Sequence, residues 1–88
     1  MVIQTSAAFE KEFKKLSKDN RELSKKKLEL FLERPSHPSL RIKRVKGYVE
    51  DPSIFELSIN MSLRVTFQRY SEFIYLRHIG THEIFRAP

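Results

Sequence analysis

Cysteine is absent from the 88-residue sequence, so neither a disulfide nor a thiolate metal site can compensate for a small core. No apolar run approaches the roughly 20 residues that a membrane-spanning helix needs. Residues 1–5 lack the charged and apolar regions that open a signal peptide. The three histidines show no recognised metal-ligand spacing. These absences predict a small cytoplasmic protein with no membrane segment, no metal and no other cofactor.

Length and charge indicate the number of domains and the kind of partner. Eighty-eight residues are enough for one domain and too few for two, so we expect residues 1–88 to share one core. The chain carries 17 Lys and Arg against 11 Asp and Glu, and 13 of the basic residues but only five of the acidic ones lie between Lys11 and Lys46. This cationic half is expected to meet an anionic partner.

Two helices are predicted in the N-terminal part of the chain. Ser6 can cap a first helix, in which Phe9, Phe13 and Leu16 form one apolar face. Asp19 followed by Glu22 has the spacing of a capping box and predicts the start of a second helix. The dipeptide 34–35, Arg-Pro, predicts its end.

From Ser36 onward the hydrophobic period changes from 3.6 to 2, which indicates strands. We expect strands at 40–45, 54–60, 63–68 and 73–79, with Met61 and Ser62 in a hairpin. Consecutive short strands with tight links favour an antiparallel meander. The sequence therefore predicts an α+β fold of order β-α-α-β-β-β-β, with two helices on one face of a four-stranded antiparallel sheet and a short N-terminal strand.

Strict alternation assigns the strand residues to two faces. The face covered by the helices takes Leu40, Ile42, Phe55, Leu57, Ile59, Leu63, Val65, Phe67, Ile74 and Leu76. The open face takes Arg41, Lys43, Glu56, Ser58, Asn60, Arg64, Thr66, Gln68, Tyr75 and Arg77. Four cations against one carboxylate on the open face favour a polyanion as partner; the alternative is a solvated surface.

Five segments stand out by their order and spacing: residues 9–11 (FEK), 37–40 (HPSL), 43–47 (KRVKG), 55–59 (FELSI) and 63–67 (LRVTF). Taken together, they resemble the RelE/ParE superfamily of bacterial type II toxins. The ending at 79–85 (IGTHEIF) is similar to the YafQ branch in particular.

The resemblance implies a ribosome-dependent messenger-RNA endonuclease that acts in the ribosomal A site, needs no cofactor and is silenced by a cognate antitoxin. We expect a monomer alone and a hetero-complex with the antitoxin. Cleavage would need deprotonation of the ribose 2′-hydroxyl, in-line attack of its oxygen on the adjacent phosphorus, neutralisation of the charge on the phosphorane, and protonation of the departing 5′-oxygen.

His82 and Arg64 are the first catalytic candidates. Imidazole titrates near neutral pH, and His82 stands where the YafQ branch carries its C-terminal catalytic histidine. The alternative is a histidine that hydrogen-bonds a backbone carbonyl. Arg64 matches an arginine that RelE-like members use against the scissile phosphate, and a guanidinium can bind phosphate bidentately. The alternative is a cross-strand partner for Glu56.

The remaining candidates are weaker. Lys46, in the basic segment, and His37, which matches a YafQ-branch histidine, complete the catalytic set. The predicted RNA contacts are Arg41, Lys43, Tyr75, Arg77, Phe85 and Arg86. Phe85 could stack on a base or fill the end of the sheet. His78 has the phase of a core-facing, structural residue.

Two positions depart from the YafQ pattern. Where that branch has a second histidine and an aspartate around the hairpin, this chain has Ser58 and Ser62, and a serine hydroxyl does not exchange protons near pH 7. Two other functions therefore stay open: inhibition of DNA gyrase by protein contact, as in ParE-type toxins, and non-catalytic binding of RNA or ribosomes.

Overall fold

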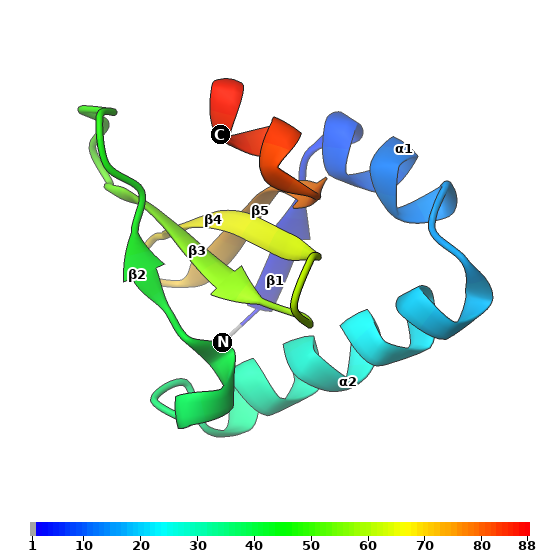
Figure 1. Ribbon diagram of the computed structural model, residues 1–88. Helices are drawn as coiled ribbons and strands as arrows, with labels where there is room; N and C mark the ends of the chain where they lie inside the picture. Colours follow the sequence, from blue (N-terminus) through cyan, green and yellow to red (C-terminus); the bar gives the residue numbers. More distant parts are fainter. Residues whose placement is uncertain (1) are drawn as a thin grey trace.

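A five-stranded sheet organises the chain (Figure 1). The computed structural model describes residues 2–88. The strands are β1 (Val2–Thr5), β2 (Lys43–Arg44), β3 (Ile54–Ser58), β4 (Arg64–Arg69) and β5 (Phe73–Gly80). Their order is β1-β5-β4-β3-β2, with β1 parallel to β5 and the other pairs antiparallel. The α+β class is confirmed. The predicted count of four antiparallel strands is wrong, because the N-terminal strand pairs with the free edge of β5.

Both helices begin at a serine. Ser6 caps α1 (Ala7–Lys14), as expected, and its Oγ accepts a hydrogen bond from the Phe9 N–H at 2.9 Å. Helix α2 (Lys18–Glu33) begins after Ser17, whose Oγ accepts from the Asn20 N–H at 3.2 Å. The capping box predicted at Asp19 is wrong, because Ser17 already satisfies the first free N–H groups.

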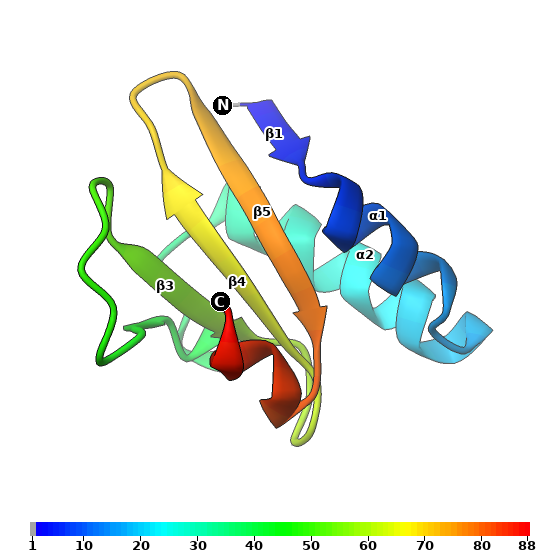
Figure 2. The same ribbon diagram turned by 90° about the horizontal axis from the view of Figure 1, so that it is seen from above.

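One face of the sheet packs on α2 (Figure 1). Phe31 of α2 is fully buried, and its ring centroid lies 4.9 Å from that of Phe67 in β4. Most of the apolar strand residues assigned to the covered face are buried here: Leu40, Leu57, Ile59, Leu63, Val65, Phe67, Ile74 and Leu76. Helix α1 contributes Phe9 and lies beside β1 and β5, as seen in Figure 2.

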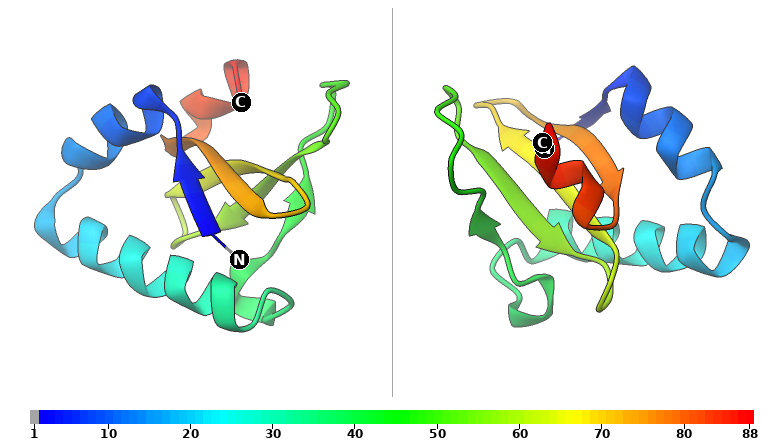
Figure 3. Two further views of the ribbon diagram at one scale, coloured as in Figure 1. Left: turned by 180° about the vertical axis from the view of Figure 1, so that it is seen from behind. Right: turned by 45° about the horizontal axis from the view of Figure 1, so that its top comes forward.

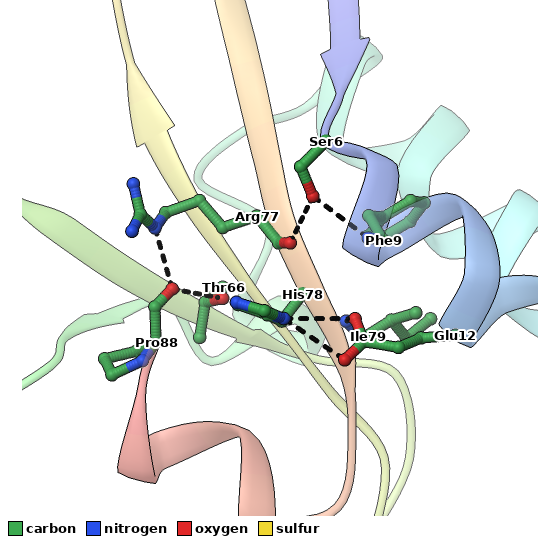
Figure 4. Close-up of polar contacts among 8 residues, drawn as sticks. All are labelled: Ser6, Phe9, Glu12, Thr66, Arg77, His78, Ile79 and Pro88. Carbon is green, nitrogen blue, oxygen red and sulfur yellow. Dashed lines mark hydrogen bonds and ion pairs between the residues drawn. The ribbon is translucent and has the colours of Figure 1, made fainter.

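The opposite face is not open. After β5 the chain forms a short 3-10 helix, η2 (His82–Arg86), which lies over this face on the side away from α2 (Figure 3). The main-chain oxygen of Pro88 accepts hydrogen bonds from Thr66 Oγ1 at 3.1 Å and from Arg77 Nε at 2.7 Å (Figure 4). Thr66 and Gln68 are consequently buried. We call residues 82–88 the strap.

The loop before β3 holds the strap from the other side. The Tyr48 hydroxyl lies 3.0 Å from the main-chain oxygen of Phe85 and 2.7 Å from that of Arg86. The predicted open face is therefore wrong: backbone oxygens of the strap accept hydrogen bonds from polar side chains that the sheet would otherwise expose.

Strand β5 contains a bulge that changes its phase. Thr66 pairs with His78 but Phe67 pairs with Leu76, so Arg77 is an extra residue in β5. Beyond the bulge, Ile79 pairs with Val65 and takes the core position. The prediction that His78 faces the core is therefore wrong.

His78 instead binds helix α1. Its Nδ1 lies 3.1 Å from Glu12 Oε2, and the Ile79 N–H donates to Glu12 Oε1 at 3.2 Å (Figure 4). Strand β1 ends opposite Leu76, so β5 has a free edge here and the α1 carboxylate occupies it.

The segment that follows α2 also departs from prediction. Residues Pro38–Leu40 form a 3-10 helix, η1, and Arg41 closes it in the left-handed region with φ 47° and ψ 48°. Strand β2 contains only Lys43 and Arg44. The predicted strand at 40–45 is wrong in its first half, because Pro38 favours a turn start and removes a backbone donor.

None of the helices within residues 2–88 combines the length and the apolar character that crossing a membrane requires.

Candidate nucleic-acid interface

Three cations line one hollow at the end of the sheet where β3 and β4 are joined. This hairpin hollow has a volume of about 270 Å³. Its lining residues are Lys27, Ser39, Arg41, Ser58, Ile59, Asn60, Met61 and Arg64. No carboxylate lines it, and within residues 2–88 none of the three cations forms an ion pair. An anion that enters it would meet several hydrogen-bond donors and no opposing charge.

Arg64 is anchored to the backbone of the hairpin. It begins β4 and pairs with Ser58, and its Nη1 donates to the main-chain oxygens of Asn60 and Leu63. Glu56 pairs with Thr66 and lies 3.9 Å from Lys43 Nζ. The alternative in which Arg64 neutralises Glu56 is therefore wrong. The guanidinium is held in place while its charge stays uncompensated.

A second arrangement connects α2 to the η1 segment. Lys27 Nζ donates to Ser39 Oγ at 3.1 Å, and Ser39 Oγ lies 2.9 Å from His37 Nδ1. The Ser39 N–H also donates to His37 Nδ1 at 3.2 Å. Since Nδ1 accepts, the ring hydrogen of neutral His37 is on Nε2. Neutral His37 therefore presents a donor, not a base, to anything that approaches Nε2.

Further cations line a neighbouring hollow along β3. This strap hollow, about 370 Å³, is lined by Lys43, Arg44, Val45, Lys46, Glu56 and Phe85. Glu56 of the strap hollow and Ser58 of the hairpin hollow are two residues apart on β3 and point to the same side of the sheet. Lys43, a predicted RNA contact, and Lys46, a catalytic candidate, share this hollow with Phe85.

His82 lies at the start of the strap. It follows Gly80, which pairs with Arg64 at the end of β5. Its side chain is exposed and makes no hydrogen bond to the part of the chain that the structure describes, and its ring centroid lies 6.1 Å from that of Phe85. The alternative in which His82 merely bonds a backbone carbonyl does not hold.

Within residues 2–88, no group of three or more His, Asp or Glu side chains is arranged to hold a metal ion.

Comparison with known proteins relates this arrangement to a group of toxins. The chain superposes on YafQ from E. coli strain BL21(DE3) with a TM-score of 0.75 at 13% identity, over 93% of each chain. It superposes on a metal-bound toxin from Helicobacter pylori with a TM-score of 0.78 at 25% identity, over 96% of this chain and 97% of that one. A chain of the intact E. coli RelBE toxin–antitoxin complex gives 0.68 at 23% identity, over 91% and 94%.

The chain has the RelE/YafQ toxin fold. No family model matches the sequence, and no curated protein is significantly similar to it. The likeness therefore lies in the arrangement of elements more than in the sequence.

On the RelE/YafQ fold, some of the predicted site residues come together and others do not. Arg64 and Arg41 share the hairpin hollow, and Lys43, Lys46 and Phe85 share the strap hollow. Arg86 lines neither; it faces a different hollow, of about 480 Å³, between α1 and η2.

Tyr75 and Arg77, which alternation assigned to the open face, lie outside the hairpin hollow and the strap hollow. The Arg77 guanidinium contacts Gln68 Oε1 at 2.6 Å as well as Pro88. Tyr75 is half-buried opposite Gln68. Their assignment as RNA contacts stays a prediction.

Sequence reasoning missed Lys27, Ser39 and Tyr48. Lys27 lies in the run Lys25–Lys26–Lys27, where no signal distinguishes one lysine from the next. In the structure Lys27 is half-buried while Lys25 and Lys26 are exposed. Tyr48 gave no signal either, because its partners are backbone oxygens of the strap.

Proposed function

We propose that this chain is the toxin of a type II toxin–antitoxin pair and that it cleaves messenger RNA on the ribosome. The observation that carries the proposal is Arg64: its guanidinium is fixed to the hairpin backbone and shares a hollow with Lys27 and Arg41 and with no carboxylate. The type II toxin assignment is supported by the structural neighbours, which are YafQ and RelBE or RelE-RelB complexes.

The chemistry divides among three groups. Lys46 is the candidate base that takes the proton of the 2′-hydroxyl as this oxygen attacks the phosphorus. Arg64 neutralises the charge that develops on the phosphoryl oxygens when the 2′-hydroxyl attacks. His82, exposed and without an internal hydrogen bond in residues 2–88, donates a proton to the departing 5′-oxygen. Because Arg64 and His82 act on one phosphodiester, the Arg64–Gly80 pairing that brings the end of β5 to the start of β4 is the feature on which the mechanism depends.

The remaining candidates bind and orient the RNA. Lys43 contacts a backbone phosphate beyond the scissile one. His37 donates a hydrogen bond through Nε2 to an RNA oxygen. Phe85, half-buried at the edge of the strap hollow, stacks against a base.

We propose an antitoxin as the cellular partner and the ribosomal A site as the place of action. The neighbours include the E. coli DinJ-YafQ complex and the RelBE complex. An acidic or amphipathic antitoxin segment complements the lysine-rich helices. The small size and positive charge suit a confined, RNA-lined site.

A second candidate function is non-catalytic binding of RNA or ribosomes. It is favoured by Ser58 and Ser62, which supply no group that exchanges protons near pH 7. Ser58 is buried beside Arg64, and the Ser62 N–H and hydroxyl are bound to Asn60 Oδ1.

The deciding experiment is induction of the protein in a translating extract, followed by mapping of messenger 5′ ends. Cuts that appear only with ribosomes support the proposal. DNA breaks without RNA cuts would indicate gyrase as the target. Arrested translation with intact messenger RNA would indicate binding without cleavage.

A further inference from the structure

Lys27 differs from the other lysines of its helix. Lys25 and Lys26 are exposed, whereas Lys27 is half-buried and its ammonium is hydrogen-bonded to Ser39 Oγ at 3.1 Å. That bond connects the middle of α2 to the 3-10 helix η1, 12 residues later in the chain. An ammonium that only solubilises a helix has no need of such a fixed position.

Arg41 reaches the same hollow through an uncommon backbone conformation. Its φ of 47° lies in the left-handed region, which non-glycine residues seldom adopt. Left-handed arginine is tolerated only where the surroundings hold it, and such residues concentrate at binding and catalytic sites. Here the conformation ends η1 and leaves Arg41 at the wall of the hairpin hollow, beside Ser39.

The three cations Lys27, Arg41 and Arg64 raise the free energy of the unliganded hollow, because like charges repel and no carboxylate lines it. A bound anion relieves that repulsion. The strap hollow is lined by further cations, Lys43, Arg44 and Lys46, with Glu56 as its one carboxylate. Cations distributed over two hollows fit an anion with repeating charges better than a single small ion.

We propose that Lys27 and Arg41 form a second phosphate subsite, separate from that of Arg64, which binds a neighbouring phosphate of a single-stranded RNA backbone. Ser39 orients the Lys27 ammonium through the hydrogen bond at its Oγ. The assignment of Arg64 to the scissile phosphate rests on the proposed function. The subsite itself is a binding property and does not require cleavage.

The test is a salt titration of binding to a fluorescein-labelled 2′-O-methyl oligoribonucleotide, which lacks the attacking hydroxyl and is not cut. Each phosphate contact contributes about 0.7 to the slope of log affinity against log salt for a single strand. We expect the double variant Lys27→Gln/Arg41→Gln to lower the slope by about 0.7, and each single variant to lower the slope by part of that amount and to weaken binding severalfold. Lys27→Arg should retain the slope of the parent protein.

Lys26→Gln is the matched control, since it removes the same charge from the adjacent, exposed position of α2. Equal slopes for Lys26→Gln and Lys27→Gln would overturn the proposal, because only a general charge effect would remain. A second result would also overturn the proposal: Lys27→Gln weakens binding of poly-glutamate but leaves RNA binding unchanged. The hollow would then bind carboxylates of a protein. Thermal unfolding of each variant excludes a folding defect.

The two proposals fail separately. If messenger RNA is not cut but the slopes differ as expected, the subsite stands and the nuclease assignment is wrong. If ribosome-dependent cuts appear but Lys27→Gln matches Lys26→Gln in the binding titration, the nuclease assignment stands and the subsite is wrong.

Discussion

The two faces of the sheet are both covered, but by different interactions. On one face α2 and the strands bring together buried apolar side chains around Phe31 and Phe67. On the other, the strap buries Ile84 and Pro88 and accepts hydrogen bonds at its backbone oxygens from Thr66, Arg77 and Tyr48. Burial of apolar area is favourable without precise direction, whereas these hydrogen bonds replace bonds to water and add little each. The helix face therefore supplies most of the stability. The strap hollow lies on the strap face, whereas the hairpin hollow lies at the end of the sheet and includes Lys27 of α2.

The largest effect on stability is expected on the helix face. Phe31→Ala removes a fully buried ring from the centre of the core and should lower the free energy of unfolding by about 3–5 kcal/mol. Leu32→Ala is the control, since the neighbouring side chain is 42% exposed. Urea denaturation measures both. Equal losses at 31 and 32 would contradict the distinction between the two faces.

The largest effect on activity is expected in the hairpin hollow. Arg64→Ala should reduce ribosome-dependent cleavage about 100- to 1,000-fold, the cost of losing one preorganised group that stabilises transition-state charge. Arg64→Lys keeps the charge without the planar fork and should recover part of the rate. The measurement is the rate of messenger 5′-end appearance. Full toxicity of Arg64→Ala would show that Arg64 is not at the site.

Two histidines separate catalysis from structure. His82→Ala should reduce cleavage about 100-fold and leave the thermal midpoint unchanged, because the His82 side chain is exposed. His78→Ala loses the contact to Glu12 at 3.1 Å and should instead destabilise the fold by about 1–2 kcal/mol. The pH profile of cleavage should change with His82 and not with His78. If His82→Ala destabilised the fold and His78→Ala changed the pH profile of cleavage, His78 would be the catalytic histidine and His82 the structural one.

The smallest effect is expected at the strap. Tyr48→Phe removes the hydroxyl that is bonded to the Phe85 and Arg86 oxygens and should cost about 1 kcal/mol. Tyr70→Phe is the matched control, because Tyr70 stacks on Phe73 through its ring. Hydrogen exchange of the strap amides should rise in Tyr48→Phe only. Unchanged exchange would mean that Thr66 and Arg77 hold the strap alone.

Local sequence signals correctly predicted the helix and strand ends that are set by residues nearby in the sequence. Ser6 caps α1, α2 stops before Pro35, and the 61–62 hairpin joins β3 to β4. Caps, prolines and alternation act within a few residues. Of the candidate site, the same alternation placed Lys43 and Arg64 on one face, where they lie.

Alternation failed wherever a distant segment changed the strand. The bulge in β5 turns His78 away from the core, and the His78 side chain contacts Glu12 of α1 instead. Arg41 left the expected strand because η1 precedes it. Hydrogen bonds connect Lys27 of α2 to Ser39, and Ser39 to His37, at the η1 segment. Because these residues come from two separate elements, no local sequence pattern predicts the connection.

By itself the sequence determined the α+β class, the two amphipathic helices, the strand pairing order after residue 54 and the excess of positive charge. Those properties follow from periodicity and composition, which the chain carries without folding. The tertiary structure alone decided that the N-terminal strand joins β5, that residues 82–88 cover the outer face, and that Lys27 meets Arg41 and Arg64 at one hollow. Each of these depends on contacts between segments far apart in the chain, whose free energy is not determined by either segment alone.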